Sequence, residues 1–326
     1  MNLVTGATGH IGNVLVRELL AQNQPVRAMV LPNDDCRSLE GLPVEKVEGN
    51  VLQPETLDRA MEDVDTVYHL AGIISIMPGA EALMRKVNVD GARNTAQAAL
   101  RAGVKRMVHI SSIHALKRLP HGVCIDENVP FAPDSPAGAY DRTKAEGTLA
   151  VLQTVEQGLD AVIACPTGVI GPYDYLGSEM GNVILGFTRK KLHFLVKGAY
   201  DFVDVRDVAK GLTQAATKGR TGETYILSGA RIEIPQIKQI VQDIVGIHTP
   251  HIVVPMWLAE FFAGLTESFY RLTHAIPILT RYSLRTVQEN CNISNAKARA
   301  ELGYHPRSLR ESIADTLAWR KSFMPA

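Results

Sequence analysis

Tyr140 and Lys144 are four residues apart in the segment Ala-Tyr-Asp-Arg-Thr-Lys-Ala-Glu, and such a pair can transfer a proton. Four residues are about one turn of an α-helix, so both side chains project from the same face. A free phenol has a pKa near ~10, and a lysine ammonium beside it is expected to lower that pKa. The pair could then donate and accept a proton near neutral pH. An exposed tyrosine and lysine on a surface helix would share this spacing, so the rest of the chain must decide between the two interpretations.

A glycine-rich loop lies at the start of the chain, between a short apolar strand and an amphipathic helix. Its glycines Gly6, Gly9 and Gly12 follow the pattern Gly-x-x-Gly-x-x-Gly. The first permits a tight turn, the second lets the backbone approach a pyrophosphate, and the third lets the helix pack on the sheet. The N–H groups at the helix start can bind the phosphates. A turn without a ligand is the alternative, but the strand before the loop and the helix after it favour a dinucleotide site.

Strands and helices alternate along most of the chain. Apolar runs predict strands at 25–30, 44–48, 66–72, 104–110 and 160–165, and helical patterns lie at 55–61, 80–102 and 140–157. This alternation predicts an α/β fold with a Rossmann-type, doubly wound parallel sheet. Ligands bind beyond the carboxyl ends of such strands. The residues at these ends are Gly6, Ala71, Ser112 and Pro166.

The pattern becomes less regular after Pro166, which predicts a smaller, mostly helical C-terminal substrate lobe. A helix and strand pattern at about 205–228 looks like a return to the first lobe. We therefore assign residues 1–165 and about 205–228 to a dinucleotide-binding domain, and residues 166–204 and 229–326 to the substrate lobe.

One stretch of the substrate lobe, 255–269, carries an apolar stripe at helical spacing. The stripe consists of Trp257, Phe261, Leu265 and Phe269. We expect it to pack on the lobe or to form a lid. A membrane-surface helix is the less favoured alternative, because few lysines or arginines stand beside the stripe.

Composition excludes several other classes of function. Lysine plus arginine and aspartate plus glutamate number 34 each, so no net charge attracts nucleic acid or an anionic membrane. No apolar run reaches the ~20 residues that span a bilayer, and the first strand leaves no room for a signal peptide. Four scattered cysteines without a Cys-x-x-Cys motif favour a reducing compartment. We expect a cytoplasmic protein with a small-molecule substrate, no nucleic-acid partner and no stable membrane insertion, and we leave a homodimer open.

A metal site is not expected. His248 and His251 are three residues apart, but Thr249 and Pro250 lie between them and break any helix. No third ligand is close in the sequence.

Several ordered motifs together resemble the extended short-chain dehydrogenase/reductase family, the superfamily of NAD-dependent epimerases and dehydratases. Within it, the chain is most similar to the dihydroflavonol reductases and 3β-hydroxysteroid dehydrogenases. The motifs are the segments 5–12, 69–72, 88–91, 110–112, 140–144, 166–172, 202–209 and 297–304. The resemblance covers nearly the whole chain and implies an NAD(P)-dependent oxidoreductase that interconverts a secondary alcohol and a ketone.

The resemblance also implies roles for particular residues. The implied catalytic residues are Ser112, Tyr140 and Lys144, with Ser112 preferred to Ser111 because it aligns with the last hydroxyl before the loop; either serine could instead cap that loop. The implied cofactor-binding residues are Gly6, Thr8, Gly9, His10, Ile11, Gly12, Asn50, Val51, Leu70, Ala71, Gly72, Asn88, Ile110, Tyr140, Lys144, Pro166, Gly168 and Val169. The implied substrate-binding residues are Ser112, Ile73, Ile74, His114, Thr167 and Tyr173.

The chain departs from the family pattern near the cofactor. Leu31 stands where relatives that prefer NADP often carry an arginine and relatives that prefer NAD carry an acidic residue. Arg37 is available to bind a 2′-phosphate, whereas Asp34 and Asp35 would repel one. The choice between NAD and NADP is therefore open. Asn50 replaces an aspartate near the adenine, and its amide can still donate and accept hydrogen bonds.

Other departures concern the substrate. Cys165, Gly168 and Tyr200 stand where sugar-nucleotide epimerases carry Arg, Asn and Arg. A diphosphate taken from water needs such cations, and the neighbouring stretches 73–77 and 173–176 are largely apolar. We therefore expect an uncharged, largely apolar substrate of flavonoid, steroid or terpenoid size. The alternatives are a sugar-nucleotide epimerase or dehydratase, and a non-catalytic dinucleotide-binding regulator.

Overall fold

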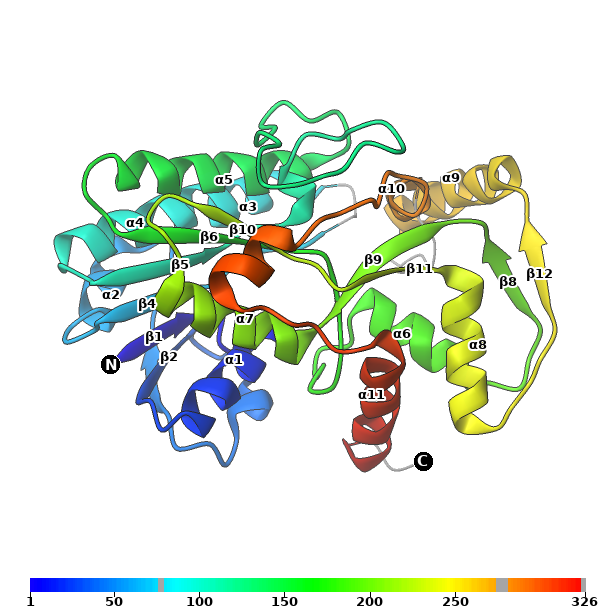
Figure 1. Cartoon of the computed structure of the whole chain (residues 1–326), viewed down its shortest axis with the longest axis horizontal. Coiled ribbons are helices and arrows are strands. Elements are labelled where there is room, and N and C mark those ends of the chain that lie inside the picture. Colours follow the sequence, from blue (N-terminus) through cyan, green and yellow to red (C-terminus); the bar gives the residue numbers. More distant parts are fainter. Residues whose placement is uncertain (76–78, 274–280, 324–326) are drawn as a thin grey trace.

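A seven-stranded parallel sheet forms the larger part of the molecule, with the strand order β10-β6-β5-β4-β1-β2-β3 (Figure 1). The computed structural model describes residues 1–75, 79–273 and 281–323, with the backbone alone for 265–273. The strands of the large sheet are β1 (Asn2–Thr5), β2 (Val26–Val30), β3 (Glu45–Glu48), β4 (Thr66–His69), β5 (Arg106–Ile110), β6 (Ala161–Pro166) and β10 (Thr224–Leu227). This order confirms the predicted Rossmann-type fold.

Helices cover both faces of this sheet. On one face α1 (His10–Ala21) packs against α7 (Val205–Lys218), and on the other lie α2 (Pro54–Ala60), α4 (Ala92–Arg101) and α5 (Ala139–Val155) (Figure 1). All residues of β1 and β6 are buried, as expected for central parallel strands between two helical layers.

The helix predicted at 80–102 is interrupted. A π-helical segment, Lys86–Gly91, separates α3 (Glu81–Arg85) from α4. Single π-turns inside helices are frequent at functional sites, and this one carries Asn88.

The remaining part of the molecule contains two small sheets that the sequence patterns did not predict. One has the order β11-β9-β7, and the other pairs β12 with β8. Their strands are β7 (Gly168–Ile170), β8 (His193–Val196), β9 (Ala199–Asp204), β11 (Ala230–Glu233) and β12 (His251–Val254). The helices here are α6 (Glu179–Gly186), α8 (Ile234–Val245), α9 (Met256–Thr273), α10 (Arg281–Thr286) and α11 (Leu309–Phe323).

The C-terminal segment contributes to both parts. Residues of α11 pack with β9 and α8, whereas Ala298, Leu302 and Tyr304 join the core formed by α1, α7 and the large sheet. The boundaries of the two lobes stay a prediction.

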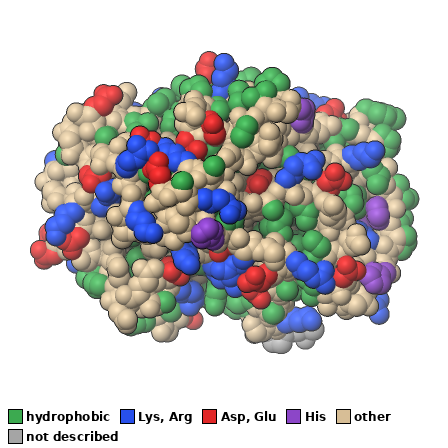
Figure 2. Space-filling model, in the orientation of Figure 1, with side chains coloured by type: hydrophobic (Ala, Val, Ile, Leu, Met, Phe, Trp, Pro, Cys, Tyr) green, Lys and Arg blue, Asp and Glu red, His purple; other side chains and the backbone are tan. Residues whose placement is uncertain are grey.

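The first two positions of the stripe expected on α9 do not pack on the lobe, and the alternative of a lid stays a prediction. Trp257 is 71% and Phe261 59% exposed, while the small side chains of Ala259 and Ala263 face inward against Leu284. The side chains of Leu265 and Phe269 lie outside the described residues. In the described part of the chain, no helix combines the length and apolar character needed to cross a membrane. Positive and negative side chains are interspersed over the face shown in Figure 2.

Candidate active site

The glycine loop between β1 and α1 contains two glycines that the backbone itself requires. Gly6 has φ = 67°, a left-handed conformation that side chains disfavour, and a Cβ there would lie 2.7 Å from the Ala71 nitrogen. A Cβ on Gly12 would lie 2.0 Å from the Gly6 carbonyl oxygen. Gly9 is different, because its φ is −69° and the nearest described atom to an added Cβ is the Gly6 oxygen at 3.4 Å. The surface at Gly9 is therefore open.

This open loop suits a dinucleotide. Within the described residues, no side chain caps the first turn of α1, so its N–H groups remain available for phosphate oxygens. The Thr5 hydroxyl accepts hydrogen bonds from the Leu70 and Ala71 nitrogens at 3.2 Å each, which fixes the end of β4 beside Gly6. The predicted residues at the end of β1, the start of α1 and the end of β4 are thus neighbours. We call the surface that they form, from Gly6 to Gly12 together with Leu70 and Ala71, the glycine cradle.

The region after β2 leaves the choice between NAD and NADP open. The Thr8 hydroxyl donates to Asp34 at 2.8 Å, which places a carboxylate against the glycine loop. The guanidinium of Arg37, which could bind a 2′-phosphate, is paired with Asp35 at 2.6 Å on the surface. Asn50 accepts a hydrogen bond from the Leu52 nitrogen, so its side chain stabilises the turn after β3.

Asn88 connects the loop after β4 to α5, which carries the predicted catalytic residues Tyr140 and Lys144. Its side-chain oxygen accepts from the Ile73 nitrogen at 2.8 Å, and its amide nitrogen donates to the Ile73 oxygen and the Thr143 hydroxyl. A Cβ on Gly72 would lie 3.3 Å from the Asn88 side-chain oxygen and 4.0 Å from the Lys144 Nζ. The π-turn therefore brings the loop after β4 to the predicted catalytic lysine.

Tyr140 and Lys144 both belong to α5, and Ser112 follows β5. The Lys144 ammonium donates to the Ile110 carbonyl at 2.6 Å. The Ser112 hydroxyl accepts from the His114 nitrogen at 3.2 Å, and a hydrogen bond from Ser112 stabilises the charged form of the Tyr140 phenol. The three residues predicted to be catalytic therefore lie together at the carboxyl end of the large sheet.

The predicted acidification of Tyr140 is wrong for the structure without cofactor. Burial raises the pKa of Tyr140 to about 12, and the hydrogen bond with Ser112 only partly opposes this effect. Burial likewise lowers the pKa of Lys144 to about 8. The spacing of Tyr140 and Lys144 indicates the nearby lysine charge but not the loss of water around both groups. Tyr140 is thus a protonated phenol at neutral pH, suited to donate a proton.

The geometry favours Ser112 over Ser111 as the site hydroxyl. Ser111 is hydrogen-bonded to the Thr148 hydroxyl at 2.7 Å and also interacts with the buried Cys165 thiol. The partners of Ser111 are therefore Thr148 and Cys165, whereas Ser112, which is equally buried, interacts with Tyr140.

The predicted substrate residues are not all brought to these catalytic side chains. His114 lies beside Tyr140, with 6.2 Å between the centroids of the two rings. The Thr167 hydroxyl donates a hydrogen bond to Asp201 at 2.6 Å. The Tyr173 ring packs against the Arg17 guanidinium, whose Cζ lies 4.6 Å from the centroid of the tyrosine ring. Ile73 is partly buried beside Asn88, whereas Ile74 is 76% exposed; Ile76 and Met77 lie outside the described residues.

A buried polar cluster around His114 was missed by the sequence analysis. Asp141 is completely buried and accepts hydrogen bonds from Arg118 at 2.5 Å and from the Tyr282 hydroxyl at 2.9 Å. Arg118 also pairs with Glu289. The only sequence signal was the position of Asp141 directly after Tyr140, because the other members are distant in the chain.

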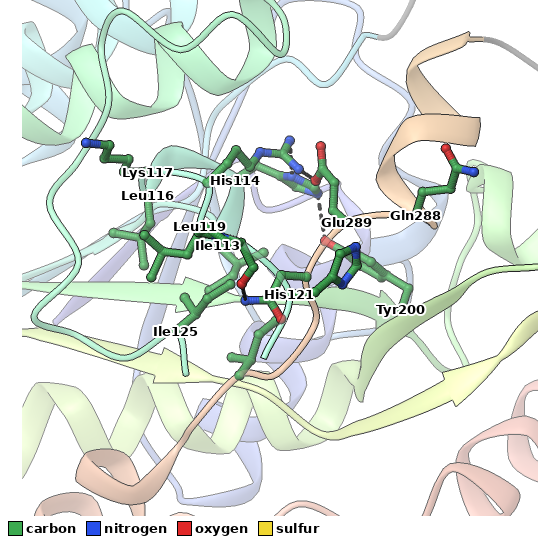
Figure 3. A pocket seen from close by; sticks show the side chains of 14 residues that line it. Ile113, His114, Leu116, Lys117, Leu119, His121, Ile125, Tyr200, Gln288 and Glu289 are labelled. Carbon is green, nitrogen blue, oxygen red and sulfur yellow. Dashed lines mark hydrogen bonds and ion pairs between the residues drawn. The ribbon is translucent and has the colours of Figure 1, made fainter. Parts of the chain in front are cut away.

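A cavity of about 230 Å³ opens beside this cluster (Figure 3). His114 and Tyr200 line one part of it. Its apolar lining includes Ile113, Leu116, Leu119, Ile125 and Ile293. Lys117, Gln288 and Glu289 also line it, so the cavity suits an apolar ligand that carries some polar groups.

Metal-binding and disulfide chemistry find no support in the described part of the chain. No group of three histidine, cysteine or acidic side chains is placed there to hold an ion. The cysteines Cys36, Cys124, Cys165 and Cys291 are free thiols.

Comparison with known proteins agrees with this architecture. The chain is 36% identical over 319 residues to sterol demethylase protein B of Methylococcus capsulatus, and the aligned region covers 97% of each protein. It is 28% identical over 319 residues to a 4-hydroxy-2-methyl-3-oxo-4-farnesyl-3,4-dihydroquinoline-1-oxide ketoreductase of Stigmatella aurantiaca, covering 96% of this chain and 94% of that protein. The crystal structure of gox2253 superposes with a TM-score of 0.86 at 31% identity and covers 99% of this chain and 98% of that one.

Residues 2–228 match the family described as the NAD dependent epimerase/dehydratase family. This match confirms the resemblance inferred from the motifs and agrees with the fit of the glycine cradle to an NAD(P) dinucleotide. The chain is therefore an NAD(P)-binding enzyme of the oxidoreductase type and belongs to the NAD-dependent epimerase/dehydratase family, the extended short-chain dehydrogenases/reductases.

Proposed function

We propose that this enzyme interconverts a secondary alcohol and a ketone on a largely apolar small molecule. The observation that carries the proposal is the placement of a protonated Tyr140 beside Ser112 and Lys144, one side chain away from a cavity that is partly lined by apolar residues. The farnesyl-bearing substrate in the name of the Stigmatella ketoreductase agrees with this chemistry.

Tyr140, Ser112 and Lys144 would each have a separate role in the reaction. The nicotinamide supplies or accepts the hydride. In the reductive direction, Tyr140 donates its proton to the carbonyl oxygen, and the Ser112 hydroxyl holds that oxygen by a hydrogen bond. Lys144 binds the cofactor ribose, and its ammonium, 2.6 Å from the Ile110 carbonyl oxygen, is held at the end of β5.

The residues at the substrate side argue against a sugar nucleotide. Tyr200 is neutral and buried, and burial raises its pKa, so it presents no cation to a diphosphate. Cys165 is completely buried, and a side chain on Gly168 would collide with the rings of Tyr200 and Phe202. Cys165, Gly168 and Tyr200 therefore provide no positive charge at the positions where sugar-nucleotide epimerases bind the diphosphate of their substrate.

The test is a substrate screen that follows NADH and NADPH oxidation with apolar ketones, aldehydes and sterols, and with UDP- and dTDP-sugars as matched controls. We expect turnover of apolar ketones with a KM that changes little with salt, because few exposed charge pairs would contribute. Tight, salt-sensitive binding and conversion of a sugar nucleotide would contradict the proposal and favour an epimerase or dehydratase. Binding of NADH without turnover of any compound would favour the regulator alternative.

A further inference from the structure

His114 lies between Arg118 and Tyr200 and forms a hydrogen bond with each. A guanidinium nitrogen of Arg118 is 3.0 Å from the histidine Nδ1, and the Tyr200 hydroxyl is 2.7 Å from Nε2 (Figure 3). A guanidinium carries only hydrogen-bond donors, so Nδ1 must act as the acceptor. Burial and the charge of Arg118 lower the pKa of His114 to about 4, so the ring is neutral at physiological pH. Its single N–H hydrogen is therefore on Nε2.

This tautomer determines the direction of the Tyr200 hydroxyl. Because Nε2–H donates to the phenol oxygen, the phenol cannot donate its own hydrogen back to the histidine. Burial raises the pKa of Tyr200, so the hydroxyl keeps that hydrogen. Among the described residues, His114 is the one recorded partner of this hydroxyl. A buried donor without an acceptor costs about 1–3 kcal/mol, so the Tyr200 O–H needs an acceptor from elsewhere.

A polar cluster behind His114 fixes the position of Arg118. Asp141 accepts from Arg118 at 2.5 Å and from Tyr282 at 2.9 Å, and Glu289 pairs with the other side of the guanidinium. Asp141 directly follows Tyr140 on α5, so the element that positions the proton donor also positions Arg118.

The location of the Tyr200 hydroxyl matches a substrate group. The His114 ring lies 6.2 Å from the Tyr140 ring and 5.7 Å from the Tyr200 ring, centroid to centroid, so Tyr200 stands one side chain away from the catalytic tyrosine. Tyr200 and His114 also line the cavity of about 230 Å³, whose other lining residues are about equally apolar and polar. A ligand that reaches from Tyr140 into this cavity would meet the hydroxyl.

We propose that the Tyr200 hydroxyl donates a hydrogen bond to a second oxygen of the substrate, and that His114 and Arg118 are positioning residues that direct this donor. The proposal rests on the proposed function and narrows its substrate class. The substrate carries, away from the reacting carbonyl, an uncharged acceptor oxygen such as a carbonyl, ether or hydroxyl oxygen.

The first test concerns the tautomer and does not depend on activity. Two-bond nitrogen–hydrogen NMR spectra of the isotope-labelled protein, with His114→Gln to identify the signals, should show the His114 hydrogen on Nε2. Arg118→Lys, which keeps a donor-only cation, should preserve this tautomer, and Arg118→Met should weaken the preference. A hydrogen on Nδ1 in the wild-type protein would overturn the proposal, and this measurement stands even if Arg118→Met fails to fold.

The second test concerns the substrate oxygen. Binding of androstanone and of androstanediones that differ in the position of the second carbonyl would be measured by calorimetry on the NADH complex. For at least one dione, Tyr200→Phe should reduce the ratio of dione to monoketone affinity by about fivefold, as expected for one lost hydrogen bond. Tyr304→Phe removes a buried hydroxyl that donates to the Ser228 carbonyl in the large-sheet core, and it should leave the ratio unchanged.

The outcomes separate this proposal from the proposed function. Tyr200-dependent binding without turnover of any ketone would contradict the proposed function but support the second-oxygen site. Turnover of ketones with a ratio that Tyr200→Phe does not change for any dione would overturn the second-oxygen site alone. Failure of every steroid probe to bind would overturn the second-oxygen site and leave the proposed function to the substrate screen.

Discussion

Gly9 and Gly12 provide a matched pair of substitutions that separates cofactor binding from folding. In Gly12→Ala the new methyl group would lie 2.0 Å from the Gly6 oxygen and 2.9 Å from the Ala7 Cα. Both neighbours are backbone atoms, so α1 must move away from β1, and overpacking of this kind typically costs about 1–3 kcal/mol. We expect the upper end of this range, because the contact is more than an ångström too short.

Gly9→Ala should behave in the opposite way. Its methyl group would lie 3.4 Å from the nearest described atom, and the φ of −69° suits alanine. The loss of stability should stay below about 1 kcal/mol, the usual effect of alanine at a helix N-cap. The methyl group would, however, occupy the surface that a pyrophosphate approaches, so we expect NADH to bind at least about tenfold more weakly, equivalent to ~1.4 kcal/mol.

Thermal unfolding followed by circular dichroism without cofactor measures the first effect, and calorimetric titration with NADH measures the second. Gly12→Ala should unfold at a clearly lower temperature, and Gly9→Ala should unfold close to wild type but bind poorly. If Gly9→Ala bound NADH as tightly as wild type, the claim that the pyrophosphate approaches Gly9 would be wrong. If Gly12→Ala were as stable as wild type, the claim that α1 packs too closely on β1 to admit a side chain there would be wrong.

Two further predictions follow from the buried titratable groups. Because burial lowers the pKa of Lys144 to about 8, its ammonium is lost as pH rises through that value, so kcat/KM for reduction should fall about tenfold per pH unit above ~8; a profile that stays flat to about pH 10 would contradict a role for the charge. The pKa of His69 is lowered to about 3, that of His114 to about 4, and that of His109 well below its usual value. Between about pH 6.5 and 4 the unfolded chain binds more protons, so stability should fall with decreasing pH by up to roughly 1.4 kcal/mol per unit for each histidine, and equal urea midpoints at about pH 7 and 5 would show this reasoning wrong.

The central part of the large sheet could be predicted from the sequence because its strands are buried on both faces. Such strands appear as continuous apolar runs, and the run at 104–110 corresponds to β5 at Arg106–Ile110. The strands β8 and β12 are short and carry exposed apolar side chains such as Phe194 and Ile252, so no clear alternation marks them. Exposure of Trp257 also depends on tertiary packing, which helical spacing alone does not determine.

The proposed catalytic residues could be named from the sequence because they lie in motifs, but their environment could not be predicted. Asp141 contacts Arg118 and Tyr282, which are 23 and 141 residues away in the chain, and no local spacing indicates such contacts. The pKa of Tyr140 depends on how completely water is excluded from the phenol, which only the folded structure shows.

Turnover by Tyr140→Phe tests the central claim most directly. The substitution removes the phenol oxygen and keeps the ring, so the packing against His114 at 6.2 Å should remain. With a ketone that the wild-type enzyme reduces, kcat should fall by about 10²–10⁴-fold, the usual contribution of general acid catalysis, while NADH affinity stays within about twofold. Near-normal turnover of the purified, folded variant would contradict the assignment of Tyr140 as the proton donor and with it the proposed reaction.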